Sequence, residues 1–419
     1  MLSRDLPGEL IDYIIDFLQD DQVALWTCHL TNRSFRPRAR FHIFRDISLN
    51  PRSILKFAER CAKTTEVPGL VKTLRIVPEF SRANDSDFET LLGEIGAYFK
   101  NVTTLIVVRA NIGSNLTKII SECFPRTALL RVVACGFQSF DILFDLLAGL
   151  PDLLDLSSGN IMAPHPLDPS PIGGNPMFCA SLKSLSLCNS DPVVPHILNE
   201  LITCARASSI TKFKIPDMQH KDSGCVQSFI DAAGNGLRDI YIGHQESVNL
   251  TQEQVVDLKK VSLLQRLTFS VITRFTRPWE NDGETNGHSL PPPNQWVPDT
   301  LRTISSKELK TIIFKIHARE KYLDDARIGL DSWKKIVDVW AQSSGLTSVQ
   351  LVSVRLRVPR NPDAWSLICL CSKMFSPNFL LLTVWIIVSY QDEDSHSLKI
   401  QGALTVYRSL LVFPHFTSQ

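Results

Sequence analysis

The sequence predicts an α/β fold in which a small three-helix module at the N-terminus precedes a curved solenoid of strands and helices. Three observations support this fold class. The first fifty residues contain three stretches with apolar residues at helical spacing. A motif of the form apolar-x-x-apolar-x-apolar then recurs ten times, and six of its nine intervals measure 27 to 31 residues. Helix-like stretches separate the copies, and such strand–helix units can bury a core only by stacking.

The N-terminal module is expected to contain three helices. The segment from Asp5 to Glu9 is typical of a helix start, with an acid as the cap and proline and glutamate in the first turn. The first helix is expected over residues 9–18, where seven of ten residues are apolar. The acid pair Asp20-Asp21 opens a second helix, and a third follows Asn32. A module this small with apolar residues on several faces is expected to bury some of them against a partner.

The order of residues in this module resembles an F-box. The pattern comprises Leu6-Pro7-x-Glu9-Leu10, Ile14-Ile15-x-x-Leu18, Asp20-Asp21, Leu25, Cys28, Leu30, Arg33, Phe35, Pro37-Arg38, Arg40, Phe44 and Ile47. It is most similar to the F-box of the large fungal (basidiomycete-type) families, with Phe35 where many relatives carry Trp. The resemblance implies docking on the Skp adaptor of SCF cullin–RING ubiquitin ligases. It places these residues at or just behind the adaptor interface: Leu6, Pro7, Leu10, Ile14, Ile15, Leu25, Cys28 and Leu30.

Two plainer interpretations of the module stay open. It could be a helical cap for the segment that follows, which explains the apolar periodicity but not the Leu-Pro-x-Glu sequence or the acid pair. The five arginines between Arg33 and Arg45 could form a nucleic-acid patch. Acids on the first two helices offset these arginines, so a solvated helix face is expected instead.

The repeat is expected to place one short strand at each motif copy. The copies start at Val71, Val102, Leu129, Pro151, Leu182, Ile210, Leu237, Leu264, Leu309 and Leu346. Apolar residues at helical spacing follow in segments 87–99, 116–124, 140–150, 196–204 and 333–340. The array resembles the leucine-rich repeats that commonly follow an F-box, although the expected Asn or Cys after the strand is clear only at Cys188-Asn189. An ordinary α/β domain with parallel strands is the alternative.

These patterns divide the chain into an F-box domain over 1–50, a repeat domain over 51–390 and a C-terminal tail or cap over 391–419. Insertions rich in proline and glycine, near 157–176 and 277–300, interrupt the repeat and are typical of long surface loops. Such loops could bind a target, because binding residues concentrate on loops, or they could be tolerated insertions.

Composition and charge narrow the class of function. The 44 Lys and Arg residues nearly balance 43 Asp and Glu, a net charge of +1 that argues against a general electrostatic grip on nucleic acid or membrane. The longest apolar run, 379–388, is about half of a membrane span and predicts a buried strand. Ten dispersed cysteines and an N-terminus without a signal-like apolar region favour a cytoplasmic or nuclear protein.

The sequence lacks the common catalytic patterns. It contains no phosphate-binding glycine loop, no His-Glu-x-x-His and no Gly-x-Ser-x-Gly elbow. His196 is expected to be an ordinary helical histidine, and Cys369 and Cys371 to be buried thiols rather than metal ligands. We therefore expect a non-catalytic protein without metal or cofactor, which acts by bringing a target close to a ligase.

Side chains two and four positions after each motif start are expected to face the open side of the sheet. The candidates for target binding are Arg75, Arg131, Lys212, Lys214, Tyr241 and Arg266, with the acids Asp155 and Asp239 beside them. The sequence thus predicts a substrate-recognition subunit of an SCF-type cullin–RING E3 ubiquitin ligase with an unknown protein target. The alternatives are a repeat-based interaction scaffold without ligase association and an enzyme on an α/β fold.

Overall fold

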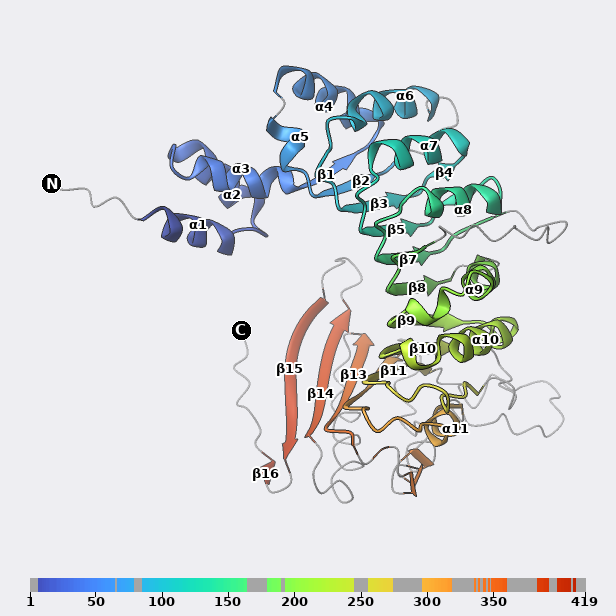
Figure 1. Ribbon diagram of the computed structural model, residues 1–419. Helices are drawn as coiled ribbons and strands as arrows, with labels where there is room; N and C mark the ends of the chain where they lie inside the picture. Colours follow the sequence, from blue (N-terminus) through green and yellow to red (C-terminus); the bar gives the residue numbers. More distant parts are fainter. Residues whose placement is uncertain are drawn as a thin grey trace, which may run out of the picture. The chain divides into compact units, whose positions relative to one another are not determined.

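The computed structural model divides the chain into two compact units, each described here by itself. The first comprises Met1–Leu182 with Ser190–Val193, and the second Lys183–Asn189 with Val194–Gln419. The structure describes residues 7–64, 66–78, 85–163, 179–189, 193–244, 255–273, 296–318, 335–336, 338–339, 342–343, 346, 348–359, 383–391, 398–407 and 410–411. Both units combine parallel strands with helices (Figure 1), which confirms the predicted α/β class of stacked strand–helix units.

The first unit begins with three helices, as predicted: α1 (Gly8–Phe17), α2 (Gln22–Thr31) and α3 (Arg36–Arg45). Asp21 caps α2, since its Oδ1 accepts a hydrogen bond of 2.9 Å from the Ala24 amide. Pro7 is the N-cap of α1 and lies just before the helix, rather than in the first turn as predicted. The predicted capping acid, Asp5, lies outside the described residues.

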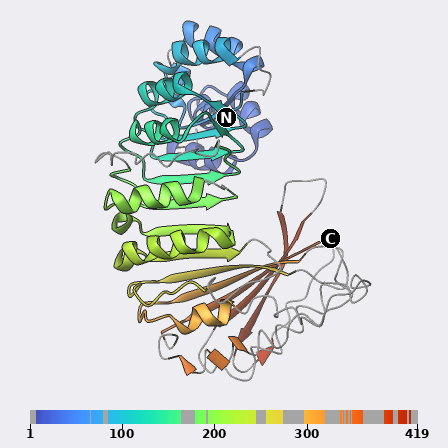
Figure 2. The same cartoon turned by 90° about the vertical axis from the view of Figure 1, so that its right-hand side faces the viewer.

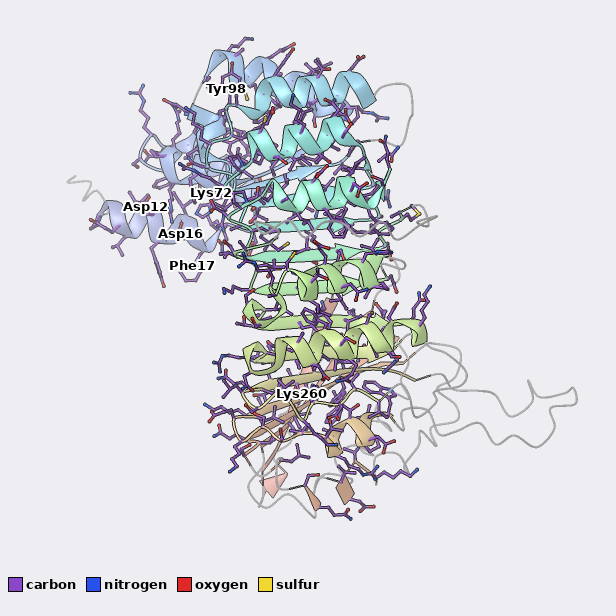
Figure 3. The ribbon with its side chains drawn as sticks, turned by 45° about the vertical axis from the view of Figure 1, so that its right-hand side comes forward. Asp12, Asp16, Phe17, Lys72, Tyr98 and Lys260 are labelled. Atoms are coloured by element: carbon purple, nitrogen blue, oxygen red, sulfur yellow. The ribbon has the colours of Figure 1, made fainter. Side chains whose placement is uncertain are left out.

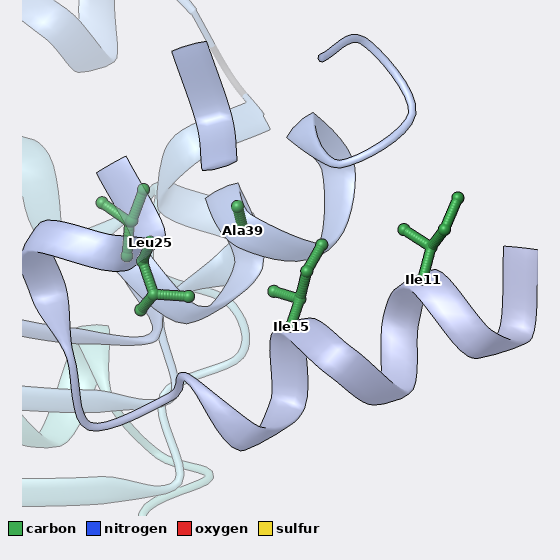
Figure 4. Close-up of a cluster of buried hydrophobic side chains, with 5 residues drawn as sticks. Ile11, Ile15, Leu25 and Ala39 are labelled. Carbon is green, nitrogen blue, oxygen red and sulfur yellow. The ribbon is translucent and has the colours of Figure 1, made fainter. Parts of the chain in front are cut away.

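A small hydrophobic core holds these three helices together. Figure 4 shows Ile11 and Ile15 of α1 directed toward Leu25 of α2 and Ala39 of α3. Ile43 completes the core, and all five side chains are buried. The inner side of α1 is thus occupied within the module, which leaves its other sides for other contacts.

The strands of the first unit form a parallel sheet in the order β1 (Asp46–Leu49), β2 (Thr73–Ile76), β3 (Thr104–Val108), β5 (Leu129–Val133) and β7 (Asp155–Gly159). The helices between them are α4 (Pro51–Lys63), α5 (Glu66–Leu70), α6 (Asp85–Gly96), α7 (Ser114–Cys123) and α8 (Phe140–Ala148). Two short strands, β4 (Asn111–Ile112) and β6 (Gly136–Phe137), pair separately. Within the described residues, β1, β2, β3 and β5 are each followed by at least one helix, as the repeat predicts.

The second unit continues this pattern and then changes it. Its parallel strands are β8 (Ser184–Cys188), β9 (Lys212–Met218), β10 (Asp239–His244), β11 (Arg266–Thr273), β12 (Thr311–Ala318), β13 (Leu351–Pro359) and β14 (Thr383–Gln391). Its helices include α9 (Val193–Thr203), α10 (Ser223–Ala233) and α11 (Trp296–Arg302). The last strands, β15 (Leu398–Tyr407) and β16 (Leu410–Leu411), are antiparallel, so the C-terminal segment does not continue the repeat.

In each unit the helices cover one side of the strands (Figure 2). Most residues that face this side are apolar and buried, with buried Thr127 and Ser158 as polar exceptions. Phe213 of β9 packs on Phe229 of α10 with ring centroids 4.8 Å apart, and Phe269 of β11 lies 5.5 Å from Trp296 of α11. Because strand side chains alternate, the residues between these point to the open side.

The sheet register corrects two weak motif copies in the first unit. The parallel pairings of β3 with β5 and of β5 with β7 move their starts from Leu129 and Pro151 to Thr127 and Leu153. Thr127 and Leu153 are fully buried, whereas Leu154 is 47% exposed. The copy at Pro151 was wrong because Leu154, an apolar residue on the open side, fits the motif in the wrong register. The copy at Leu129 was wrong because its true start, Thr127, is not apolar.

Two further changes concern the ends of the repeat. Pairing of Ile312 with Val352 moves the last copy from Leu346 to Val349. A copy that the sequence analysis missed, Phe44-Arg-Asp-Ile47-Ser-Leu49, lies on β1 and pairs with β2. Phe44 and Ile47 are part of the F-box pattern, so the repeat sheet begins inside the range predicted for the F-box.

Parts of several predictions fall outside the described residues. Of the two insertions, 164–176 and 277–295 lie outside, while 296–300 belongs to α11. The apolar run 379–388 forms a strand where it is described, in β14. Cys369 and Cys371 also lie outside. Over the described residues, no helix is long and apolar enough to cross a membrane.

A residue in the left-handed conformation follows four successive repeat strands. These residues are Arg109, Ala134, Asn160 and Asn189, with φ angles of 53°, 53°, 51° and 43°. Each comes directly after the last residue of its strand. Asparagine tolerates this conformation, whereas arginine and alanine are strained in it. Asparagine, which is expected after the strand of a leucine-rich repeat, therefore occupies two of these four positions. Arginine and alanine occupy the other two, at a cost in backbone strain.

Replacing Ala134 with glycine should stabilise the chain by about 1 kcal/mol, because glycine adopts positive φ without strain. The matched control is Ala58→Gly in the middle of α4, which should destabilise by about 1 kcal/mol. Urea unfolding followed by circular dichroism compares both variants with the parent. A lower midpoint for Ala134→Gly would contradict the strained turn.

Candidate protein-interaction surfaces

The described residues expose an unusual number of large apolar side chains on α1 and α2. Seven of the eleven exposed large apolar residues lie on these two helices: Leu10, Tyr13, Ile14, Phe17, Val23, Trp26 and Leu30. The members on α1 follow the spacing i, i+3, i+4 and i+7, which puts them on one helical face. Phe17, labelled at the end of α1 in Figure 3, is 73% exposed. We call these seven residues the apolar docking face.

The predicted adaptor-binding residues divide between this face and the core beneath it. Leu10, Ile14 and Leu30 are on the face, and Pro7 is exposed beside it. Ile15 and Leu25 are fully buried underneath, and Cys28 is half-buried. Leu6 lies outside the described residues. The arrangement agrees with the predicted positions at or just behind a surface, and it does not by itself identify what binds there.

Sequence reasoning missed four members of the face. Tyr13, Phe17, Val23 and Trp26 are not part of the F-box pattern, although the spacing of apolar residues along each helix could have revealed them. Tyr13 and Phe17 contact each other edge to face, with ring centroids 4.8 Å apart. This contact widens the exposed aromatic surface at one end of α1.

A charged cluster fixes α1 against α3. The Asp16 carboxylate accepts hydrogen bonds of 2.5 and 2.7 Å from the Arg38 guanidinium, and its Oδ1 lies 2.6 Å from Nε2 of the buried His42. The hydrogen bond from Arg38, followed by that from His42, lowers the pKa of Asp16 to about 2. Because Asp16 lies between Ile15 and Phe17, this cluster sets how α1 presents the apolar docking face.

The three-helix module is joined rigidly to the first repeats. Helix α3 ends at Arg45 and β1 begins at the next residue, so no linker separates them. The Lys72 amide donates a hydrogen bond of 2.8 Å to the Arg45 carbonyl, and Arg40 forms an ion pair of 2.7 Å with Glu66. The docking face therefore keeps a fixed orientation relative to the strands that follow.

The six predicted target-binding residues all lie on strands and point to the open side. In the first unit, Arg75 and Arg131 are exposed between buried neighbours on β2 and β5. In the second unit, Lys212, Lys214 and Arg266 are exposed. Tyr241 is half-buried, as is its neighbour Asp239. The predicted orientation is confirmed, whereas the binding role remains a prediction.

In the second unit these residues form a cluster around Tyr241. The Lys214 and Lys315 ammonium groups lie 5.2 and 4.4 Å from the centre of the Tyr241 ring. Arg266 pairs with Asp239 at 3.4 Å. Lys315 was missed because it lies six positions after its motif start, beyond the two positions considered. Continuing the alternation along the longer strand β12 would have found it.

Burial shapes the acid–base behaviour of this surface. It raises the pKa of Tyr241, and it raises the pKa of Asp239 although Arg266 and Lys212 act in the opposite direction. The Cys188 thiol donates a hydrogen bond of 3.0 Å to Asp217, and burial together with this carboxylate raises the thiol pKa to about 12. Cys188 is thus a poor nucleophile at neutral pH. Among the described residues, no three His, Cys, Asp or Glu side chains are placed to hold a metal ion.

Comparison with known proteins shows only distant likenesses. No protein-family model and no curated protein matches the chain. A chain in the crystal structure of the TLR13–ssRNA13 complex is similar at 12% identity and a TM-score of 0.37, covering 86% of this chain and 42% of that one. A chain in the crystal structure of the Rad7 and Elc1 complex in yeast is similar at 11% identity and a TM-score of 0.41, covering 93% and 90%. TM-scores this low carry no argument about function.

Replacing Asp16 with Asn should loosen α1, because the amide carries no negative charge and has one acceptor oxygen where the carboxylate has two. We expect a loss of about 1 kcal/mol near pH 7, the upper range for a partly exposed pair. The native pKa lies below the usual 3.8, so this contribution is complete above about pH 4 and fades as pH falls toward 2. Amide hydrogen exchange of α1 measures the effect.

Asp12→Asn is the matched control for this change, one helical turn earlier on α1 and exposed. It should leave the exchange rates of α1 nearly unchanged. Equal effects of the two substitutions at pH 7, or a difference that persists at pH 2, would contradict the role of the cluster.

Proposed function

We propose that this chain is a substrate-recognition subunit of an SCF-type cullin–RING E3 ubiquitin ligase. In this proposal the apolar docking face binds the Skp adaptor, and the open side of the strands holds a target protein. The observation that carries it is the exposure of residues that the F-box-like pattern assigns to the adaptor interface. Leu10, Ile14 and Leu30 are exposed on α1 and α2, together with four further large apolar side chains on the same two helices.

The physical argument is that large apolar side chains are exposed on α1 and α2 and would be stabilised by burial against a partner. Completely burying one large apolar side chain stabilises by about 1.5–3 kcal/mol, and seven of them are exposed on α1 and α2. Monomeric proteins rarely leave large contiguous apolar surfaces uncovered. The core of the module does not need these side chains, because Ile11, Ile15 and Leu25 already fill it. A protein partner that covers the face supports the F-box interpretation.

The remainder of the chain suits a receptor rather than an enzyme. A ubiquitin ligase receptor needs no reactive side chain, because it accelerates transfer by holding the target near the charged enzyme. Within the first unit, α3 continues directly into β1, so the three-helix module and the first strands are joined without a linker. A cytoplasmic or nuclear location belongs to the same proposal.

A repeat-based interaction scaffold without ligase association is the second candidate. The charged open side of the strands favours it equally, because that surface is independent of α1 and α2. The two candidates differ in a single property, which is binding to the adaptor.

The test is binding of the purified chain to a recombinant Skp adaptor by isothermal titration calorimetry. The parent chain should bind, and Ile14→Asp/Phe17→Asp should bind at least about 100-fold more weakly, because two central apolar contacts are lost. Leu55→Asp, at an equally exposed leucine on α4, is the control and should bind like the parent. Unchanged circular dichroism establishes that the variants fold. No binding by the parent would favour the scaffold.

A further inference from the structure

We infer that an acidic peptide segment binds along the edge of the second unit at which strands β8 to β12 begin. We call this edge the basic strip, because an exposed lysine or arginine stands at the start of each strand: Lys183, Lys212, Arg238, Arg266 and Lys310. The inference rests on the proposed function only in taking the segment as part of a target protein. It adds the chemical class of that segment and the place where it is held.

Hydrogen bonds between neighbouring strands set the spacing of the basic strip. Strands β8 to β12 lie side by side and run parallel (Figure 1). The Lys183 carbonyl accepts a hydrogen bond of 3.0 Å from the Lys212 amide. In the same way, the Arg238 carbonyl accepts one of 2.9 Å from the Arg266 amide. The backbone therefore holds the five cations on strands that are about 4.8 Å apart.

Positive charge exceeds negative charge on the basic strip. The acids beside it in the described chain are Asp239, the first residue of β10, and the exposed Glu308, just before β12. Asp239 is already engaged by Arg266 at 3.4 Å. Within the part of the chain that the structure describes, no ion pair involves Lys183 or Lys310. The whole chain carries a net charge of only +1, so the excess is local.

Two further lysines, shortly before β11, are neutralised within the unit. Lys260, labelled in Figure 3, pairs with Asp231 at 2.8 Å. Lys259 pairs with Asp257 at 3.6 Å. These lysines already have carboxylate partners, so they are not counted with the basic strip.

The fold does not require cations at the strand starts. In the first unit, the residues directly before β3, β5 and β7 are the neutral Thr103, Ala128 and Leu154. The Thr103 carbonyl accepts a hydrogen bond of 3.0 Å from the Leu129 amide, just as the Lys183 carbonyl accepts one in the second unit. The same backbone contacts thus form without a positive charge, so the cations of the basic strip are available for binding.

Farther along the same strands the surface closes, and no large apolar side chain is offered to a partner. Thr268 and Ser270 of β11 and Ile313 of β12 are buried, with exposed fractions of 4%, 4% and 8%. Among the described residues, the exposed large apolar side chains all lie in the first unit, the last of them at Met162. A partner at the basic strip is therefore held through charge, which an acidic segment complements.

The length and chemistry of the basic strip favour a peptide over a nucleic acid. From β8 to β12 the strip spans about 19 Å, a length that roughly six residues of extended peptide can cover. Carboxylates at neighbouring positions of such a peptide can reach successive cations. Proteins that bind single-stranded nucleic acid add aromatic side chains on which the bases stack. The basic strip consists of lysine and arginine and includes no aromatic residue.

The test is fluorescence anisotropy with a labelled hexaglutamate peptide, using the full chain without any adaptor. We expect saturable binding that weakens as salt is added, and no binding of hexaglutamine. Lys183→Gln/Lys212→Gln/Lys310→Gln should weaken binding at least about tenfold, because three charge pairs with the peptide are lost. The corresponding variant with three arginines should retain binding, and unchanged circular dichroism establishes that both variants fold.

Lys56→Gln/Lys63→Gln/Lys100→Gln is the matched control, because it removes the same charge from three exposed lysines of the first unit. It should bind the peptide like the parent. Equal losses in the two glutamine variants, equal binding of both peptides, or no binding by the parent would overturn the inference. Tighter binding of single-stranded RNA that the strip variant abolishes would also overturn it. Since no adaptor is present, failure of adaptor docking cannot produce any of these results.

Discussion

Alternation of side chains along parallel strands determines where almost every residue of the repeat lies. Helices cover one side of the strands, so most residues that face this side are apolar and buried, as Leu74, Leu105 and Phe213 are. One strand and one helix cannot bury these residues alone, and each copy therefore depends on its neighbours. The opposite side is under no such requirement. It can carry charges such as Lys214 without loss of stability, which makes it the part of the repeat that is free to acquire a binding function.

The N-terminal helices follow a different rule, because apolar residues occupy two sides of α1. One side forms the core with α2 and α3, and the other side is left exposed. The Asp16–Arg38–His42 cluster holds α1 in the orientation that separates these two sides. Since α3 continues directly into β1, the exposed side and the first strands form one rigid body.

Much of this structure could be predicted from the sequence, and the failures have physical causes. Helices and strand order follow from apolar spacing, which depends only on local geometry. The predicted motif starts at Leu129, Pro151 and Leu346 were wrong. Neighbouring apolar residues allow more than one register for the motif, and only the pairing of the strands determines which one is correct. Lys315 was missed because the lengths of strands are not encoded in the motif. Spacing could identify all the apolar residues of α1 and α2, but it could not show which of them are exposed, since a stripe that faces a core looks the same as one that faces a partner.

The central claim is that α1 and α2 together form the surface that docks on an adaptor. Hydrogen–deuterium exchange of the chain with and without a recombinant Skp adaptor tests this claim most directly, because it locates the contact without any substitution. The account predicts slower exchange in Gly8–Phe17 and Gln22–Thr31 when the adaptor is bound, with the strands of the second unit unchanged. Protection confined to the strands, or no protection anywhere at saturating adaptor, would contradict it.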